Sequence, residues 1–201
     1  MIARHRTRAP VRVLWLAAAF MLNGAPAEAH LVTTGLGPVY DGISHFLLSP
    51  EDFVPVVVLA LWAGQSGAET ARRVLFVLPA AWLGGALGGV MLAAAPPPDL
   101  TWLIFILLGG LVAAHLRAPG AAVLAVASLI GLFKGFINGA EMTAAMNMVS
   151  LIGITATVFT VTALVATAVV AFTWPPAKIA FRVLGSWTTA TGLLLLGWSL
   201  R

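Results

Sequence analysis

Long apolar runs, separated by short polar or proline-containing breaks, make up most of this chain. Six runs approach the roughly 20 residues that an α-helix needs to cross a hydrocarbon core of about 30 Å. Prolines lie in three of the breaks between runs, where the ring removes a backbone donor and restricts the preceding residue, so that helices end there. The pattern predicts an all-α fold, a polytopic membrane helix bundle of about six transmembrane helices. The predicted spans are 53–68, 74–95, 100–116, 119–137, 149–172 and 181–199.

The stretch 31–48 departs from this pattern. It is moderately apolar, but it carries Pro38, Asp41 and His45. Irregular backbone at membrane depth is tolerated where protein or a water-filled cavity surrounds it. We therefore predict a short or re-entrant helix on the outer side of the membrane. The alternative joins this stretch to the first span as one long broken helix.

The first 29 residues have the pattern of a secretory signal peptide. Four arginines within the first dozen residues precede the short apolar run 13–22, and Ala27-Glu28-Ala29 forms a small-x-small cleavage pattern. A basic region, a short apolar region and such a site are typical of a cleaved signal. We expect residues 1–29 to be removed and 30–201 to form a single transmembrane domain. The alternative is an uncleaved signal anchor.

Composition excludes most soluble functions. The chain is 60% hydrophobic and 9% charged, whereas soluble domains carry roughly a quarter charged residues. It has no cysteine, which excludes a disulfide-stapled domain and a cysteine-ligated metal centre. The formal net charge of +4 comes largely from the arginines before the apolar run 13–22, so it does not indicate a nucleic-acid partner. The partner that composition predicts is the lipid bilayer.

The loop charges predict the orientation. With residue 30 outside, alternating spans place five basic residues on the inner side, as the positive-inside rule requires. Glu51 and Asp52, expected as acidic first-turn residues of the first span, fall outside together with Asp99. We expect a multi-pass protein of the cytoplasmic membrane with its mature amino terminus outside. The inner basic residues are Arg72, Arg73, Arg117, Lys178 and Arg182.

Two polar stripes stand out, because ionisable groups inside a membrane are costly and mark functional sites. Asp41 and His45 are four residues apart and share a helix face. Lys134, Asn138 and Glu141 follow the i, i+4, i+7 pattern of another face. The predicted topology places both stripes at the outer side, where they would line one outward-facing cavity. The alternative is a structural salt bridge of Lys134 with Glu141 or Asp41.

Glycines accompany the second stripe. Gly131, Gly135 and Gly139 recur every four residues, a spacing that lets neighbouring helix backbones approach closely. We expect these glycines to let their helix pack closely against another helix, which brings the polar stripe against that neighbour.

Other potential ligands have simpler alternatives. After cleavage His30 would offer an α-amine and an imidazole to one metal ion, or would be a solvated terminal residue. Met142, Met146 and Met148 are potential soft ligands, but such a stripe is usually packing. His115 lies beside a predicted helix end, where it would act as a C-terminal cap residue.

The polar segments resemble the HupE/UreJ family of bacterial membrane proteins. The segment from His30 to Asp52 is similar to the start of the UreJ-like branch. The family motif Phe-His-Gly-x-x-His-Gly-x-Glu corresponds to Phe133-Lys134-Gly135-Phe136-Ile137-Asn138-Gly139-Ala140-Glu141. Lys134 and Asn138 stand where the motif has histidines. An ammonium group donates hydrogen bonds and binds no metal until it loses a proton, whereas imidazole is a natural nickel ligand.

The resemblance implies a permease for a divalent transition-metal ion, nickel or cobalt, in the bacterial inner membrane. The ion would be a transported substrate, with no permanently bound cofactor. His30, Asp41, His45 and Glu141 would then supply the ligands. The alternative function is a non-transporting accessory or assembly protein for a metalloenzyme, whose polar cluster is structural.

Within the permease hypothesis, Lys134 and Asn138 line the site. Lys134 would act as a movable tether that pairs with a carboxylate when the metal is absent. We do not expect an enzyme, because Ser44 and His45 are sequence neighbours and point in different directions on a helix. The sequence leaves the oligomeric state open.

Overall fold

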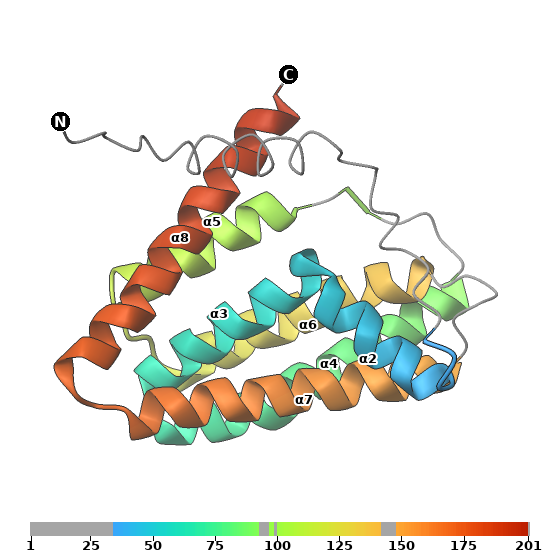
Figure 1. Ribbon diagram of the computed structural model, residues 1–201, viewed down its shortest axis with the longest axis horizontal. Coiled ribbons are helices and arrows are strands. Elements are labelled where there is room, and N and C mark those ends of the chain that lie inside the picture. Colours follow the sequence, from blue (N-terminus) through green and yellow to red (C-terminus); the bar gives the residue numbers. More distant parts are fainter. Residues whose placement is uncertain (1–33, 93–96, 99, 142–147, 201) are drawn as a thin grey trace, which may run out of the picture. The chain divides into compact units, whose positions relative to one another are not determined.

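The protein is described by a computed structural model that covers residues 34–92, 97–98, 100–141 and 148–200. This part of the chain contains helices and no strand (Figure 1). The described residues do not include the predicted signal peptide 1–29, His30, Met142 or Met146. The helices are α2 (Pro38–Leu48), α3 (Pro50–Ser66), α4 (Ala68–Leu92), α5 (Thr101–Ala113), α6 (Gly120–Ala140), α7 (Met148–Ala171) and α8 (Pro175–Ser199).

The six predicted spans correspond to α3 through α8, with shifted boundaries. Proline at the first helical position, where no backbone donor is needed, begins α3 at Pro50 and α8 at Pro175. α4 begins six residues earlier than predicted, because a single residue, Gly67, separates it from α3. Gly67 has φ 124°, a conformation open to glycine and strained for other residues.

The helices are long and apolar enough for a membrane protein. α4, α6, α7 and α8 each satisfy the length and hydropathy expected of a span, and α2 with α3 satisfies them as one unit bent by 75°. α5 has 13 residues, which gives it a length of about 20 Å. The all-helical, polytopic class predicted from the apolar pattern is confirmed, and the segment 31–48 contributes a short helix bent against the first span.

Close contacts between helices give their directions. Gly135 lies against Trp82, and Gly139, four residues later, lies against Ala86, so α4 and α6 run parallel. Asp52 at the start of α3 contacts residues near the end of α6, so these two helices are antiparallel.

The remaining helices complete the alternation. Gly64 near the end of α3 lies against Val169 near the end of α7, so α3 and α7 run parallel. Gly192 of α8 lies against Trp102 of α5, and Gly185 lies against Gly109, so α5 and α8 are antiparallel. Gln65 near the end of α3 donates to the Val112 carbonyl near the end of α5, so these two helices are parallel and successive helices from α3 to α8 reverse direction.

The alternation defines two ends of the bundle. The Asp52 end holds the start of α3, α5 and α7 and the end of α4, α6 and α8. The Arg117 end holds the opposite termini and all five basic residues predicted to face inward.

The short helix α2 is fixed at the Asp52 end by close packing. Phe46 is fully buried and meets the ring of Trp82 edge-on, with ring centroids 5.7 Å apart. Gly42 lies so close to the Ser150 carbonyl of α7 that a β-carbon would overlap it. α2 is therefore part of the core rather than an appendage.

Candidate functional site

A buried ion pair lies at the Asp52 end of the bundle. The Lys134 ammonium of α6 is 3.0 Å from the Oδ1 atom of Asp52 on α3, and each side chain is 3% exposed. Withdrawing two charges from solvent is costly, and their mutual attraction offsets that cost when further hydrogen bonds complete the site.

Two further polar residues complete this site. Asn138 Nδ2 donates to Asp52 Oδ2 at 2.7 Å, and the Lys134 ammonium lies 3.4 Å from Thr101 Oγ1 at the start of α5. The four side chains, hereafter the Asp52 cluster, join α3, α5 and α6. Asn138 is 5% exposed and Thr101 is 3% exposed, so the cluster is enclosed by protein.

Local structure explains how these side chains meet. The Asp52 amide donates to the Ser49 carbonyl at 3.0 Å, which places Asp52 in the first turn of α3. Lys134 and Asn138 are four residues apart and therefore lie on one face of α6. Antiparallel packing brings that face against the start of α3.

The Asp52 cluster corrects two sequence-based interpretations. Asp52 lies in the first turn of α3, as predicted. Its carboxylate also forms an ion pair with Lys134, which the prediction of a first-turn acidic residue did not include. Within the described residues, Lys134 pairs with Asp52 and not with Glu141 or Asp41. Asp52 was not predicted as a site residue from the sequence, because the antiparallel packing of α3 and α6 is a tertiary feature. The available signal was an acidic residue at the outer end of a predicted span, level with Lys134.

The remaining described ligands of the prediction belong to α2 and to the C-cap of α6. Asp41 accepts hydrogen bonds from the Thr34 amide at 2.6 Å and the Thr34 hydroxyl at 2.7 Å, which tie the chain before α2 to the helix. His45 is half-buried on α2, and Glu141 is exposed at the C-cap of α6. No three histidine or acidic side chains of the described residues gather closely enough to hold one ion. His30 lies outside those residues.

The glycines of α6 lie against α4. A β-carbon on Gly135 or Gly139 would overlap the carbonyl oxygen of Trp82 or Ala86, and one on Gly131 would lie 2.8 Å from the Ala81 β-carbon. These glycines allow α6 to approach α4 with one face while Lys134 and Asn138, on a neighbouring face, point to α3.

The Asp52 cluster contains an unused acceptor. The carbonyl oxygen of the Asn138 amide is buried and has no hydrogen-bond partner among the described atoms. The amide nitrogen of the same side chain donates the hydrogen bond to Asp52. Carboxylate, amide and hydroxyl oxygens within one enclosed site are ligands for hard or borderline divalent cations.

At the Arg117 end, α5 ends in a Schellman turn. His115 has φ 54°. Its amide donates to the Val112 carbonyl at 3.0 Å, and the Leu116 amide donates to the Leu111 carbonyl at 3.0 Å. These are the two hydrogen bonds of that motif, in which glycine is the usual residue at the left-handed position.

Side chains from other helices satisfy the carbonyls around this turn. Trp62 Nε1 donates to the Leu116 carbonyl at 2.8 Å, and Arg182 Nε donates to the Ala113 carbonyl at 2.8 Å. Burial, together with the positive charges of Arg117, Arg182 and Lys178, lowers the pKa of His115 below its ordinary value of 6.5. The folded protein therefore holds a proton on His115 less readily than an exposed histidine would.

The fold and the Asp52 cluster define a polytopic α-helical membrane protein with an ion pair buried between its helices. The family model of the HupE / UreJ protein family matches residues 18–195. The chain belongs to this family, which is associated with nickel or cobalt transport or with accessory roles. Comparisons with curated proteins and with solved structures gave no significant match.

Proposed function

We propose that this protein is a permease for a divalent transition-metal ion, nickel or cobalt, and that the Asp52 cluster is its cation site. The observation that carries the proposal is the buried pair of Asp52 and Lys134, joined by Asn138. A charge pair with surplus polar partners inside a helix bundle is a functional-site hypothesis by default. Membership in a family associated with nickel or cobalt supports the choice of ion.

The family motif supports the same location. Positions 134 and 138 are the two motif positions that hold histidine in the HupE/UreJ pattern, and both face Asp52 in this chain. Two imidazoles and one carboxylate form a ligand set that suits nickel or cobalt. In this chain Lys134 places one positive charge where a divalent ion would meet the carboxylate.

Lys134 then acts as a displaceable counter-cation. In the ion-free protein its ammonium neutralises Asp52, and an arriving ion with twice its charge competes for that carboxylate. Displacement exposes Asp52 and the free Asn138 carbonyl oxygen as ligands, and the long lysine side chain can withdraw without moving α6. Lys134 was predicted to pair with a carboxylate when the metal is absent, and in this proposal that carboxylate is Asp52.

The second candidate function is a non-transporting accessory protein in which the Asp52 cluster is a structural lock. Its support is that Lys134 already neutralises Asp52, and that no group of three histidine or acidic side chains forms in the described segments. Under this alternative the cluster stabilises the contact among α3, α5 and α6, and it does not exchange ions.

Metal accumulation in cells separates the two functions. We expect Asp52→Asn to abolish nickel or cobalt uptake per molecule of membrane-inserted protein, while Glu51→Gln, the neighbouring acidic residue in the same turn, leaves uptake unchanged. The neutral pair Asp52→Asn/Lys134→Gln removes both charges and is expected to restore protein abundance without restoring uptake. Recovery of uptake in that double variant, or normal uptake in Asp52→Asn, would overturn the permease proposal.

Restoring the motif tests the location of the site. Lys134→His/Asn138→His creates two imidazoles beside Asp52 and should increase the affinity of purified protein for nickel by about tenfold or more, which corresponds to about 1.4 kcal/mol. Adding Asp52→Asn to this variant should remove the gain. An equal gain without Asp52 would place the ion elsewhere.

A further inference from the structure

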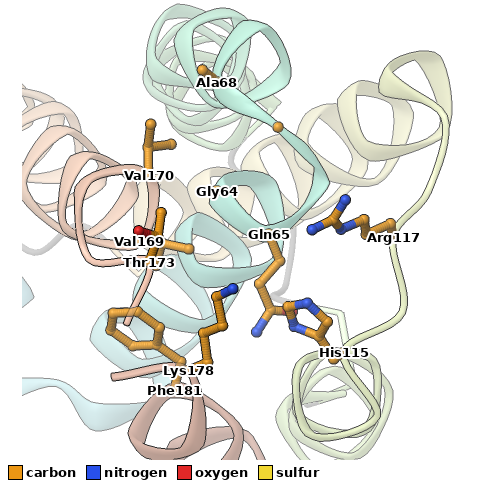
Figure 2. Close-up of a pocket in the computed structure, with 11 residues that line it drawn as sticks. Gly64, Gln65, Ala68, His115, Arg117, Val169, Val170, Thr173, Lys178 and Phe181 are labelled. Carbon is orange, nitrogen blue, oxygen red and sulfur yellow. The ribbon is translucent and has the colours of Figure 1, made fainter. Parts of the chain in front are cut away.

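A second polar site lies at the Arg117 end, separated from the Asp52 cluster by the length of α3. A pocket of about 230 Å³ opens where the ends of α3 and α7 meet the turn after α5 and the start of α8. Its polar side chains include Gln65, His115, Arg117 and Lys178 (Figure 2).

The charge of this pocket is positive and is not balanced locally. Arg117 and Lys178 extend into it from two different segments, as Figure 2 shows, and the described residues that line it include no carboxylate. Glu69, an acidic residue at the same end, is bound by Arg72 and Arg73. The pocket therefore concentrates positive charge in a concave surface, an arrangement that attracts anions.

Neutral polar groups add directional hydrogen bonding. Gln65 is 6% exposed, and its Nε2 atom donates to the Val112 carbonyl at 3.4 Å, which leaves a second N–H on the same nitrogen. His115 Nδ1 is buried and has no partner within the described part of the chain. An anion in the pocket would meet an amide donor and an imidazole nitrogen as well as two cations.

The pocket also has an apolar part, which lies beside Lys178. Val169 and Val170 of α7 and Phe181 of α8 line it, and Trp174 between these helices is 58% exposed. Tryptophan is enriched where a membrane meets water. The pocket thus combines basic and apolar side chains close to an exposed tryptophan.

We infer that this pocket binds an anionic phosphate group, and that its basic and apolar lining favours the headgroup of an acidic phospholipid over free phosphate. Arg117 would hold two phosphate oxygens through its planar fork, and Lys178 would add a point charge. Basic pockets between transmembrane helices are known to bind such headgroups. The valines and Phe181 would contact the glycerol and the first acyl carbons.

Lipid binding to the purified full-length chain tests this inference. Retention of phosphatidylglycerol is measured by native mass spectrometry, with phosphatidylcholine, a zwitterionic lipid of zero net charge, as the reference. We expect Arg117→Gln/Lys178→Gln to weaken phosphatidylglycerol binding about tenfold or more, as expected from losing charge-assisted hydrogen bonds. Arg72→Gln/Arg73→Gln removes the same charge from the same end and should change it little.

The outcomes separate the two phosphate sources. If inorganic phosphate at millimolar concentration displaces phosphatidylglycerol from the wild type, the phosphate site stands and free phosphate is its ligand as well. Equal phosphatidylglycerol retention by both double variants would overturn the inference, and so would equal retention of the two lipids by the wild type. Lys178→Gln alone, at an exposed position of α8, provides the measurement if the pocket double variant does not fold.

Discussion

At the scale of single residues, Asp52 and Lys134 each depend on the other. Both side chains are 3% exposed, so neither charge has solvent to stabilise it. Truncating one partner of such a pair is far more damaging than removing both, because the remaining charge stays buried without compensation. His115 is a second residue whose surroundings set its behaviour, since burial and three neighbouring cations lower its pKa.

Lys134→Met should therefore destabilise the protein by about 3–5 kcal/mol, the usual cost of leaving one buried charge unpaired. Asp52→Asn/Lys134→Met should recover most of that loss. Thermal unfolding in detergent measures both variants. Under the permease proposal, added nickel or cobalt should stabilise Lys134→Met and leave the double variant unaffected. Equal stability of the single and double variants would contradict the dependence of each charge on the other.

The lowered pKa of His115 predicts a pH dependence at the Arg117 end. Protonation of His115 adds a positive charge beside Arg117, Lys178 and Arg182, so phosphatidylglycerol binding should tighten as the pH falls from 7.5 to 5.5. Without lipid, the unfolded chain takes up this proton near pH 6.5 more readily than the folded chain does, so stability should fall over the same range.

His115→Gly provides the control for this pH dependence. Glycine suits the left-handed position of the Schellman turn, so this variant removes the imidazole while preserving the turn. Its lipid binding should change less between pH 7.5 and 5.5 than that of the wild type. An identical pH profile in the two proteins would show that another group titrates.

At the scale of helices, close contacts and bends position the polar groups. The glycine face of α6 lies against α4, which turns Lys134 and Asn138 toward α3. The 75° bend between α2 and α3 occurs at the residue before Pro50, where the proline disfavours helical backbone. The bend allows α2 to pack on α7 while Asp52 starts a helix that points into the bundle.

Gly135→Ala and Gly88→Ala make the same chemical change with opposite expected results. The new β-carbon at position 135 would overlap the Trp82 carbonyl, whereas at position 88 it would meet a Phe136 ring carbon at 3.8 Å, an ordinary contact. Gly135→Ala should lower the thermal unfolding temperature and, by moving α6, reduce metal uptake. Gly88→Ala should leave both nearly unchanged. Similar behaviour of the two variants would contradict the close approach of α4 and α6.

At the scale of the whole molecule, six alternating helices separate the two sites. The Asp52 cluster lies at the end that carries acidic residues, and the basic pocket lies at the end that carries Arg72, Arg73, Arg117, Lys178 and Arg182. The positive-inside rule predicts that the Asp52 cluster faces the outside and the basic pocket faces the cytoplasm.

Single-cysteine labelling tests this orientation, and the absence of native cysteines makes it direct. Leu36→Cys and Trp174→Cys place thiols at positions that are 71% and 58% exposed, at opposite ends of the bundle. A membrane-impermeant maleimide should label position 36 in intact cells and position 174 after permeabilisation. The reverse pattern would invert the topology and move the Asp52 cluster to the cytoplasmic side.

Hydropathy and proline positions were sufficient to predict the helical class, the six segments and the short helix near residue 40. The boundary at Gly67 was missed, because a single residue separates two helices there. For the site, Lys134 and Asn138 were identified by their cost in an apolar helix and by the motif. Their partner was assigned wrongly, because residues 52 and 134 are brought together by packing between distant helices.

The sequence by itself determined that this chain is a membrane helix bundle of the HupE/UreJ type, since apolar periodicity and local motifs act over short stretches of chain. Tertiary structure alone decided that Lys134 and Asn138 meet Asp52 and that Arg117 and Lys178 share a pocket with Gln65. The physical reason is that glycine contacts and alternating helix directions set which side chains become neighbours. Both depend on how whole helices pack against each other.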